Sequence, residues 1–506
     1  MTLARTRGIT LQGLRGEVVD IEVDVGHGLP AYTLLGLPDA ALSESRDRIR
    51  SAIANSQRIW PNKKVTVSLS PAWLPKSGSG FDLAIAISIL AASEQIDISG
   101  FSETLFLGEL ALDGSLRAIR GVLPITIAAR GHGMKRIIVP QGNFTEARLI
   151  DDLDVISFET LNEVLRWIAT GQRNESPQMA LETDVSRSEL DMADVRGQSD
   201  AKFALEVAAV GGHHMIMIGP PGTGKTMLAE RFSTILPPLS QEESIEVTAI
   251  HSIAGELRNR SSLSRIPPFC APHHSTTTVA MVGGGAHQIK PGAVSLAHHG
   301  VLFIDEAPEC ASGILDSLRQ PMESGVVSIS RASGTVSYPA RFILILAANP
   351  CPCGRFFGRG RSCECSSLQV RRYLNKLSGP LIDRMDLRLV VETPRRSDLA
   401  SDAAEEKSEA IRSRIMEARK RTLERLREYG LTLNSQVPSN LLRSPLKAEK
   451  SAMSHLHSLI DKEAITARGF HKVLRVAWSI SDLRDYDRPG LEEVEIALAL
   501  RAGLRA

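Results

Sequence analysis

The sequence has little cysteine, no excess of either charge and no long hydrophobic run. Its 59 Lys and Arg residues balance 58 Asp and Glu residues, so net charge selects neither nucleic acid nor a membrane surface as a partner. The longest nearly unbroken apolar run, Leu83 to Ala92, is too short for a membrane span, which needs about 20 residues. The first residues also lack the apolar core of a signal peptide. We therefore expect a cytoplasmic protein with no membrane span.

The chain is long enough for several domains. With 506 residues, of which 43% are hydrophobic and 23% charged, it should fold as roughly three domains, and a disordered or fibrous chain is excluded. We expect an α+β domain over residues 1–170, a linker over 171–190, an α/β domain over 191–395 and an all-helical C-terminal lid over 396–506.

Apolar spacing predicts the elements of each domain. In the first domain it predicts strands within 16–35, 64–70 and 104–112, and helices at 39–55, 81–92 and around 125–129. Short apolar runs at 215–218, 301–304 and 342–348 suit a buried parallel sheet. The lid should hold helices at about 404–428, 465–483 and 491–504.

A phosphate-binding loop is the strongest motif. The pattern G-x-x-x-x-G-K-[ST] is met by Gly219, Pro220, Pro221, Gly222, Thr223, Gly224, Lys225 and Thr226. A predicted strand precedes the loop and helical residues follow it, as the motif requires. In such loops backbone N–H groups bind phosphate oxygens, the lysine neutralises β/γ-phosphate charge and the hydroxyl binds Mg²⁺. The sequence therefore predicts a site for ATP and Mg²⁺.

Two further predicted strands end in polar residues suited to hydrolysis. The run 301–304 leads into Asp305 and Glu306, which would place one carboxylate on Mg²⁺ and the other beside an attacking water. The strand at 342–348 ends in Asn349, which would hold that water or sense the γ-phosphate. An Asn before a proline is also a common turn former.

These motifs, with residues along nearly the whole chain, resemble the AAA+ ATPases and, within them, the magnesium-chelatase-like ComM/YifB family. The resemblance rests on VGHGLP at 25–30, GLPDA at 36–40, LPKSGSGFD at 74–82, DVRGQ at 194–198, AHHGVLFIDE at 297–306 and LSGPLIDRMD at 377–386. It implies a homohexameric ring in which Asn349 is the first sensor residue, Arg384 is an arginine finger acting on a neighbour's nucleotide and Arg468 is the second sensor in the lid. An ion pair of Arg384 with Asp383 or Asp386, and a structural role for Arg468, are the alternatives.

The resemblance also implies a Lon-protease-like N-terminal domain, with the ribosomal S5 domain 2-like fold. The protease pattern requires a nucleophilic serine and a later lysine, and this sequence has Gly80 and Leu123 near those places. A Ser/Lys dyad needs both groups within hydrogen-bond reach. We therefore expect a scaffold or a nucleic-acid-facing collar, with Ser79 as a shifted nucleophile the alternative.

Four of the six cysteines form two C-x-C pairs that follow Asn349. Cys351 and Cys353 are separated by nine residues from Cys363 and Cys365, and glycines in between allow the chain to fold back. Four thiolates so spaced suit one structural, tetrahedral Zn²⁺. Unliganded thiols and a redox or iron–sulfur site are the alternatives.

Several segments suggest contact with DNA. Lys290, in residues 281–292, and Arg331, near the tip of a strand pair predicted at 326–338, fit the family's pore hairpins, which point into the central channel of the ring. Basic residues mixed with the aromatic residues Phe356, Phe357 and Tyr373 suit phosphate contact and base stacking. A surface hairpin and a solvated loop without ligands are the alternatives.

Three pairs of adjacent histidines, at 213/214, 273/274 and 298/299, invite interpretation as metal sites. Adjacent side chains diverge on a strand or a helix, so each pair would supply one ligand at most. We expect structural or hydrogen-bonding roles for them.

The motifs predict an ATP-hydrolysing, Mg²⁺-dependent enzyme. By family resemblance it would be a hexameric DNA helicase that acts on branched or single-stranded DNA and promotes branch migration during natural transformation. Hydrolysis would alternate the positions of the lid and move the channel hairpins. A chelatase-type motor that remodels a protein partner and an ATP-dependent protease are the alternative functions.

Overall fold

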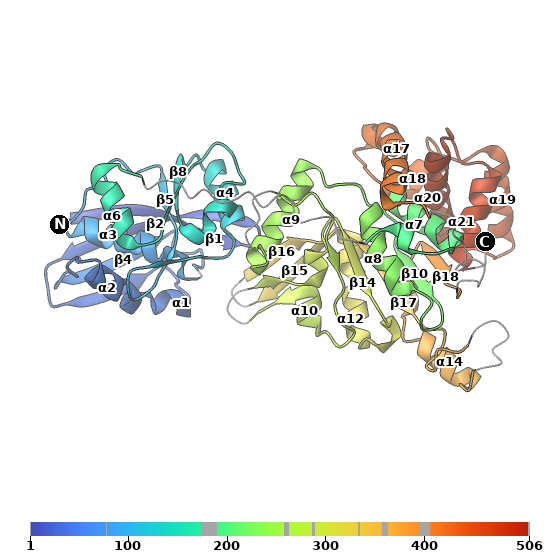
Figure 1. The fold of residues 1–506 in the computed structure, drawn as a ribbon, viewed down its shortest axis with the longest axis horizontal. Helices are drawn as coiled ribbons and strands as arrows, with labels where there is room; N and C mark the ends of the chain where they lie inside the picture. The colour runs from blue at the N-terminus through green and yellow to red at the C-terminus, as the bar shows by residue number, and fades with distance from the viewer. Residues whose placement is uncertain are drawn as a thin grey trace.

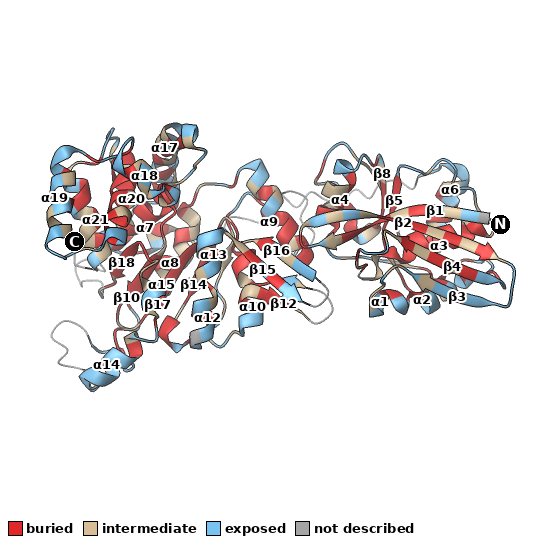
Figure 2. Cartoon of the chain, turned by 180° about the vertical axis from the view of Figure 1, so that it is seen from behind, coloured by how far each residue is buried: buried red, intermediate tan, exposed pale blue. Residues whose placement is uncertain are grey.

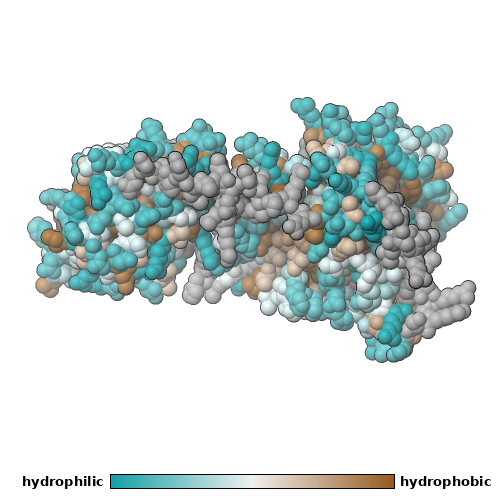
Figure 3. Space-filling view, viewed as in Figure 1, coloured by the Kyte–Doolittle hydropathy of each residue, from teal (hydrophilic) through white to brown (hydrophobic). Residues whose placement is uncertain are grey.

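The computed structural model of the chain describes residues 2–76, 78–173, 190–257, 263–285, 289–331, 334–356, 363–393 and 405–503. These residues form an elongated molecule with the N-terminal domain at one end, a parallel-sheet domain in the middle and a group of helices at the other end (Figure 1). Hydrophilic residues dominate the face seen in Figure 3. Within the described ranges, every helix is too short or too polar to span a membrane.

A mixed seven-stranded sheet forms the N-terminal domain, in the order β3-β4-β2-β1-β5-β8-β9. Its strands are β1 (Thr2–Gln12), β2 (Arg15–Gly26), β3 (Ala31–Leu35), β4 (Lys64–Ser70), β5 (Thr104–Phe106), β8 (Arg136–Pro140) and β9 (Asp154–Phe158), and β6 (Glu109–Leu110) pairs with β7 (Leu116–Arg117). Its helices are α1 (Ala40–Ser43), α2 (Ser45–Asn55), α3 (Asp82–Ala92), α4 (Val122–Gly131), α5 (Phe144–Ala147) and α6 (Leu161–Thr170).

The alternating apolar residues of β2 explain how this sheet packs. Val19, Ile21 and Val23 are fully buried, and they share one core with α2 and α3. Almost every side chain of α3 is buried, which fits its nearly continuous apolar sequence (Figure 2). A second core on the other face of the sheet joins Ile9 to residues of α4. The sheet therefore carries helices on both faces.

The middle domain contains a five-stranded parallel sheet in the order β11-β14-β17-β10-β18. Its strands are β10 (Met215–Ile218), β11 (Phe269–Cys270), β14 (Val301–Ile304), β17 (Ile343–Ala348) and β18 (Leu387–Val390), and two hairpins are formed by β12 (Gly283–Gly284) with β13 (Lys290–Pro291) and by β15 (Val326–Arg331) with β16 (Gly334–Pro339). Its helices are α7 (Ser199–Gly211), α8 (Lys225–Ile235), α9 (Gln241–Ala254), α10 (Thr278–Val282), α11 (Ala293–Leu296), α12 (Ser312–Ser317), α13 (Arg319–Ser324), α14 (Ser367–Leu374) and α15 (Gly379–Ile382).

The C-terminal helices share one hydrophobic core with the parallel sheet. They are α17 (Ser408–Leu426), α18 (Ser439–Arg443), α19 (Lys450–Asp461), α20 (Ala467–Arg484) and α21 (Leu491–Ala502). Met217 of β10, Ile415 of α17 and Val476 of α20 are fully buried in the same cluster. Burial of apolar surface is the main favourable term in folding, so the sheet and these helices stabilise each other.

Most predicted elements are confirmed, and the exceptions have local causes. The strands predicted at 64–70, 215–218 and 301–304 coincide with β4, β10 and β14, and the helices predicted at 81–92 and 465–483 correspond to α3 and α20. The single strand predicted at 104–112 is wrong, because the chain leaves β5 and forms β6 after Gly108, whose φ is 154°. The sequence did not reveal β11, which has two residues.

The N-terminal domain packs directly on the middle domain. The Gly121 N–H donates to Ser252 O at 3.3 Å, and the Ser252 hydroxyl donates to Glu146. The turn between β1 and β2 lies on the hairpin β15–β16, where a Cβ placed on Gly13 would be 2.8 Å from Ser337 O. These contacts join the first domain to the helix α9 and to one of the predicted pore hairpins.

Candidate functional site

Three loops meet at the carboxyl edge of the parallel sheet. The phosphate loop follows β10, Asp305 follows β14 and Asn349 follows β17, and these three strands are neighbours. Lys225 Nζ donates to Asn349 Oδ1 at 3.2 Å, and the Thr226 hydroxyl donates to Asp305 Oδ2 at 2.7 Å. The structure therefore brings together residues that lie 79 and 124 positions apart in the sequence and that were predicted to act on one nucleotide.

The phosphate loop has a backbone that its glycines make possible. Gly222 and Gly224 have φ of 78° and 89°, values that favour glycine, and α8 begins immediately afterwards. The Thr223 hydroxyl donates to Pro220 O at 2.9 Å and closes the loop. The first N–H groups of α8 have no partner within the helix, and they lie at the positive end of its dipole. The loop is therefore built to receive an anion.

Lys225 is the cation of this loop. Its side chain is largely buried, and its Nζ also donates to Gly219 O at 2.7 Å and to Pro220 O at 2.9 Å. Burial lowers the pKa of Lys225, and the negative charges of Asp305 and Glu306 oppose that shift. A phosphate beside Nζ would favour the charged form of the lysine for the same electrostatic reason.

Thr226 and Asp305 fit a Mg²⁺ site. A hydroxyl and a carboxylate are hard oxygen ligands, and Mg²⁺ in nucleotide sites takes one or two such groups together with phosphate oxygens and waters. The Glu306 N–H donates to Asp305 Oδ1 at 2.8 Å, which orients the carboxylate so that Oδ2 meets the Thr226 hydroxyl. Both ligands lie next to the loop that would hold the phosphates.

His274 is a site residue that the sequence analysis missed. Its Nδ1 lies 3.5 Å from Glu306 Oε2, and the Glu306 side chain is 50% exposed, so a water can reach it. His274 follows β11, the edge strand beside β14. A two-residue strand gives no periodic signal, and for that reason the sequence did not place this histidine at the site. An imidazole this close to the Glu306 carboxylate can influence how that carboxylate holds a water.

Arg384 lies at the opposite edge of the sheet from the phosphate loop. It stands three residues before β18, whose amino end is paired with the amino end of β10, whereas the phosphate loop follows the carboxyl end of β10. Its guanidinium pairs with Glu323 and donates to Pro380 O at 2.8 Å. The alternative partners considered from the sequence, Asp383 and Asp386, pair with other cations.

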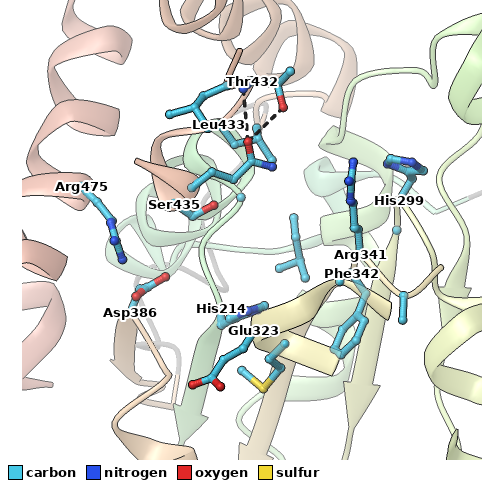
Figure 4. Close-up of a pocket in the computed structure, with 18 of the residues that line it drawn as sticks. His214, His299, Glu323, Arg341, Phe342, Asp386, Thr432, Leu433, Ser435 and Arg475 are labelled. Atoms are coloured by element: carbon cyan, nitrogen blue, oxygen red, sulfur yellow. Dashed lines mark hydrogen bonds between the residues drawn. The ribbon is translucent and has the colours of Figure 1, made fainter. Parts of the chain in front are cut away.

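Arg468 lies beside Arg384. It occupies the second position of α20 and pairs with Asp383. Both arginines line a cleft of about 1440 Å³ between the amino ends of the strands and the C-terminal helices. His214 and Phe342 line the same cleft (Figure 4). This edge lies at the opposite end of the strands from the chain's own phosphate loop.

Buried charges form one wall of this cleft. Asp386 Oδ1 is 2.8 Å from Lys472 Nζ, and its Oδ2 is 3.3 Å from His213 Nδ1. Burial raises the pKa of Asp386, but the neighbouring cation and histidines outweigh it and hold this pKa well below its usual range. Burial lowers the pKa of His214 to about 4, and its Nδ1 accepts the Leu344 N–H at 3.0 Å.

The histidines 298 and 299 converge on one carboxylate. His298 Nε2 and His299 Nε2 lie 2.9 Å and 3.1 Å from Glu246 Oε2, and the left-handed backbone of His299, with φ 56°, makes this possible. His298 Nδ1 accepts the Arg341 N–H at 3.0 Å, so Nε2 of the neutral ring carries the proton and donates to Glu246. That tautomer offers Nε2 no lone pair for a metal. The pair is hydrogen-bonded as expected, but the expectation that adjacent side chains diverge is wrong here.

The two predicted pore hairpins pack against each other. The Tyr338 hydroxyl donates from β16 to Ile289 O at 2.8 Å, and Arg331 Nη2 lies close to Gly284 of β12. Lys290 and Arg331 are both exposed. Residues 286–288 of the first hairpin and residues 332–333 of the second lie outside the described residues. Two cations therefore stand on one unit built from two hairpins.

The four clustered cysteines also come together. The sulfur atoms of Cys351, Cys353, Cys363 and Cys365 all lie within 4.8 Å of one another. Beyond them Arg371 and Arg372 are exposed on α14, whereas Tyr373 is buried. Tyr373 is therefore not the base-stacking group that the sequence suggested, and Phe357 lies outside the described residues.

In the N-terminal domain the residues around the predicted protease motif have other partners. The Ser79 hydroxyl donates to Glu109. Lys76 is almost fully buried, with 1% of its surface exposed, and its ammonium donates to Pro71 O. Ser77 lies outside the described residues. Within the described residues, Ser79 and Lys76 are hydrogen-bonded to these other groups and do not form a Ser/Lys dyad.

Comparison with known proteins covers almost the whole chain. Residues 191–399 match the family described as magnesium chelatase, subunit ChlI, and residues 405–501 match the C-terminal part of the same subunit. Residues 21–143 match a further family described as subunit ChlI of Mg-chelatase. The matches therefore include the N-terminal domain, the parallel-sheet domain and the C-terminal helices.

Full-length relatives share this organisation. An uncharacterized protein of Mycobacterium tuberculosis is 45% identical over 501 residues, which cover 99% of each chain. The competence protein ComM of Haemophilus influenzae is 39% identical over 516 residues, covering 100% of this chain and 98% of that protein. The uncharacterized protein YifB of Escherichia coli is 40% identical over 496 residues, covering 97% of this chain and 95% of that protein.

Proposed function

Since the chain belongs to the ComM/YifB family of magnesium-chelatase-like AAA+ proteins, we propose that it is a cytoplasmic, ATP-hydrolysing motor that assembles as a homohexamer and acts on DNA. Its activity would be that of a helicase that promotes branch migration of recombination intermediates during natural transformation. The similarity to a competence protein over the full length supports this reading.

The observation that carries the proposal is the separation of the two halves of the hydrolytic site. Lys225 and Asp305 lie at the carboxyl edge of the sheet, and Arg384 lies at the amino edge. An arginine finger must reach the transferring phosphate to stabilise its charge. A neighbouring subunit therefore has to supply it, and a head-to-tail contact repeated around a closed ring does so for every subunit.

Each residue at the carboxyl edge would have its own task. Lys225 would neutralise the β- and γ-phosphates, and Mg²⁺ held by Thr226 and Asp305 would neutralise the charge that develops on them. Glu306 would orient the attacking water, and Asn349, which accepts a hydrogen bond from Lys225, would hold that water or sense the γ-phosphate. Arg468, beside Arg384, would read the neighbour's nucleotide.

The hairpin unit is the proposed DNA contact. Lys290 and Arg331 are exposed on packed hairpins, and cations in such positions bind phosphates without reading sequence. Arg371 and Arg372 on α14 offer further exposed charge. DNA, branched or single-stranded, is therefore the proposed partner, and ATP, Mg²⁺ and a structural Zn²⁺ at the cysteine cluster are the proposed cofactors.

The test is to measure ATPase rate and strand displacement on a four-way DNA junction. Wild-type protein should hydrolyse ATP, bind the junction and displace a strand. Glu306→Gln should still bind nucleotide and junction but should neither hydrolyse ATP nor displace a strand. A wild type that hydrolyses ATP without binding or responding to any DNA would remove the helicase assignment and retain the ATPase.

A chelatase-type motor that remodels a protein partner is the second candidate. The families matched over residues 191–399 and 405–501 are described as a magnesium chelatase subunit. An ATPase rate that responds to a partner protein and ignores DNA would favour this function. The protease alternative is not proposed, because Ser79 and Lys76 have the other partners described above.

A further inference from the structure

The four clustered thiol groups have the spacing of a metal site. The Sγ atoms of Cys351 and Cys353 each lie 3.7 Å from that of Cys363 and 3.3 Å from each other. A tetrahedral Zn²⁺ with Zn–S bonds of about 2.3 Å separates its sulfurs by about 3.8 Å. A disulfide requires about 2.05 Å between sulfurs. The arrangement therefore fits four thiolates around one ion, with Cys365 as the fourth.

The surroundings of the cluster also fit a structural ion. Cys351 is fully buried, and its sulfur accepts the Phe356 N–H at 3.3 Å. Hydrogen bonds of this kind hold metal ligands in place. The remaining cysteines, Cys270 on β11 and Cys310 after β14, do not belong to the group, so the chain provides two matched thiols outside it.

The loop that carries the first pair of cysteines rests on the phosphate loop. Gly354 has φ 74°, and a Cβ placed there would be 2.5 Å from Pro221 Cδ and 2.6 Å from Pro221 Cγ. The backbone at Gly354 is therefore in direct contact with the phosphate loop, four residues before Lys225. A movement of this loop would remove its contact with Pro221 and so change the packing of the phosphate-binding backbone.

The segment after the second pair returns to the first sensor residue. Cys365 leads into α14, whose buried Tyr373 has its hydroxyl beside the backbone N–H of Asn349. Asn349 Oδ1 in turn accepts the hydrogen bond from Lys225 Nζ. The cluster is thus tied to the nucleotide site on two sides, through Pro221 and through Asn349.

From these contacts we infer that Zn²⁺ bound by Cys351, Cys353, Cys363 and Cys365 braces the nucleotide site. The ion closes the loop that contacts Pro221 and fixes the helix whose Tyr373 lies beside Asn349. Its loss lowers nucleotide affinity and turnover, although no cysteine touches the nucleotide. This inference rests on the ATPase function proposed above.

The test combines metal analysis with nucleotide binding. Purified wild-type protein should hold one zinc per chain by elemental mass spectrometry. Cys363→Ser and Cys365→Ser should lose it, and their affinity for Mg²⁺-ATPγS and their ATPase rate should fall about 10-fold to 100-fold. Cys270→Ser and Cys310→Ser should keep the zinc and wild-type nucleotide affinity. Circular dichroism should show the same helix content in all variants.

A glycine variant tests the contact with Pro221 separately from zinc binding. Gly354→Ala places a methyl group against Pro221, so it should keep the zinc and still weaken nucleotide binding. Gly171→Ala is the control, because Gly171 has a similar φ of 69° and open space around it. This variant should bind nucleotide as the wild type does.

Two results would overturn the inference while leaving the ATPase intact: a wild type that binds nucleotide but holds no zinc, or zinc-free variants that bind nucleotide like the wild type. Weakened DNA binding with unchanged nucleotide affinity would also overturn it, because the cluster would then be part of the DNA contact. A wild type that holds zinc but binds no nucleotide would refute the proposed function, and the inference with it.

Discussion

Replacing Arg384 by alanine should stop ATP hydrolysis and leave the fold intact. An arginine finger accelerates hydrolysis by about 10³ to 10⁵, and a factor of 10³ corresponds to about 4 kcal/mol of activation free energy. The ion-pair partner of Arg384, Glu323, has a side chain that is 58% exposed, so solvent screens the pair although the side chain of Arg384 itself is only 16% exposed. Exposed ion pairs contribute about 0–1 kcal/mol to stability. Catalysis should therefore fall by at least about 10³-fold, with a nearly unchanged unfolding transition.

Phosphate release at saturating Mg²⁺-ATP measures the first effect, and urea unfolding measures the second. Glu323→Gln is the matched control, because it removes the same ion pair and keeps the guanidinium. This control should hydrolyse ATP at close to the wild-type rate. A matching loss of activity in Glu323→Gln would assign the effect to the ion pair.

Mixed rings test whether the arginine acts between subunits. Arg384→Ala and Lys225→Ala should each be inactive alone. In a ring of head-to-tail contacts assembled from equal amounts of both, about a quarter of the interfaces combine an intact phosphate loop with an intact arginine. Activity should therefore reappear on mixing. Mixtures as inactive as the separate variants, or an active Arg384→Ala protein, would refute the reasoning.

Three further predictions concern other parts of the chain. Changing His274 to alanine removes the neighbour of Glu306 and should lower kcat about tenfold without changing KM for ATP; His274→Asn, which keeps a donor, should recover part of the loss, and equal rates in all three proteins would exclude a role for this contact. Changing Lys290 or Arg331 to alanine should weaken DNA binding for all sequences alike and reduce the slope of log K against log salt by about one each; anisotropy titrations with unchanged slopes would contradict the hairpin proposal. The free energy of unfolding should fall by about 2 kcal/mol from pH 7 to pH 5, because the folded pKa of His214 is lowered from 6.5 to about 4 and only the unfolded chain takes up a proton in that range. Urea unfolding of the wild type and of His214→Gln at both pH values measures this, and a variant as pH-sensitive as the wild type would assign the effect to other groups.

The sequence was sufficient to predict features that depend on neighbouring residues. The phosphate loop at 219–226 and the strands that end at Asp305 and Asn349 each combine an apolar run with polar residues directly after it. In a parallel sheet such ends meet at one edge, so their convergence also follows from the pattern. The clustered cysteines are close in the chain and were predicted for the same reason.

Features that depend on distant residues or on backbone strain could not be predicted. The pairing of Arg468 with Asp383 joins the start of α20 to the segment before β18. The convergence of His298 and His299 requires a left-handed backbone at His299, a conformation that few non-glycine residues adopt. Tyr373 stands among basic residues, as an exposed base-stacking residue would, and only the folded structure shows that it is buried.

The common core of the parallel sheet and the C-terminal helices limits how the molecule can work. Met217, Ile415 and Val476 belong to one continuous apolar interior, so a hinge between sheet and lid would expose that interior to water at each turnover. In the proposed ring, a movement that keeps this block rigid and shifts whole protomers relative to one another avoids that cost. Each protomer would then move as a rigid body, and the conformational change would be concentrated at the interfaces between protomers.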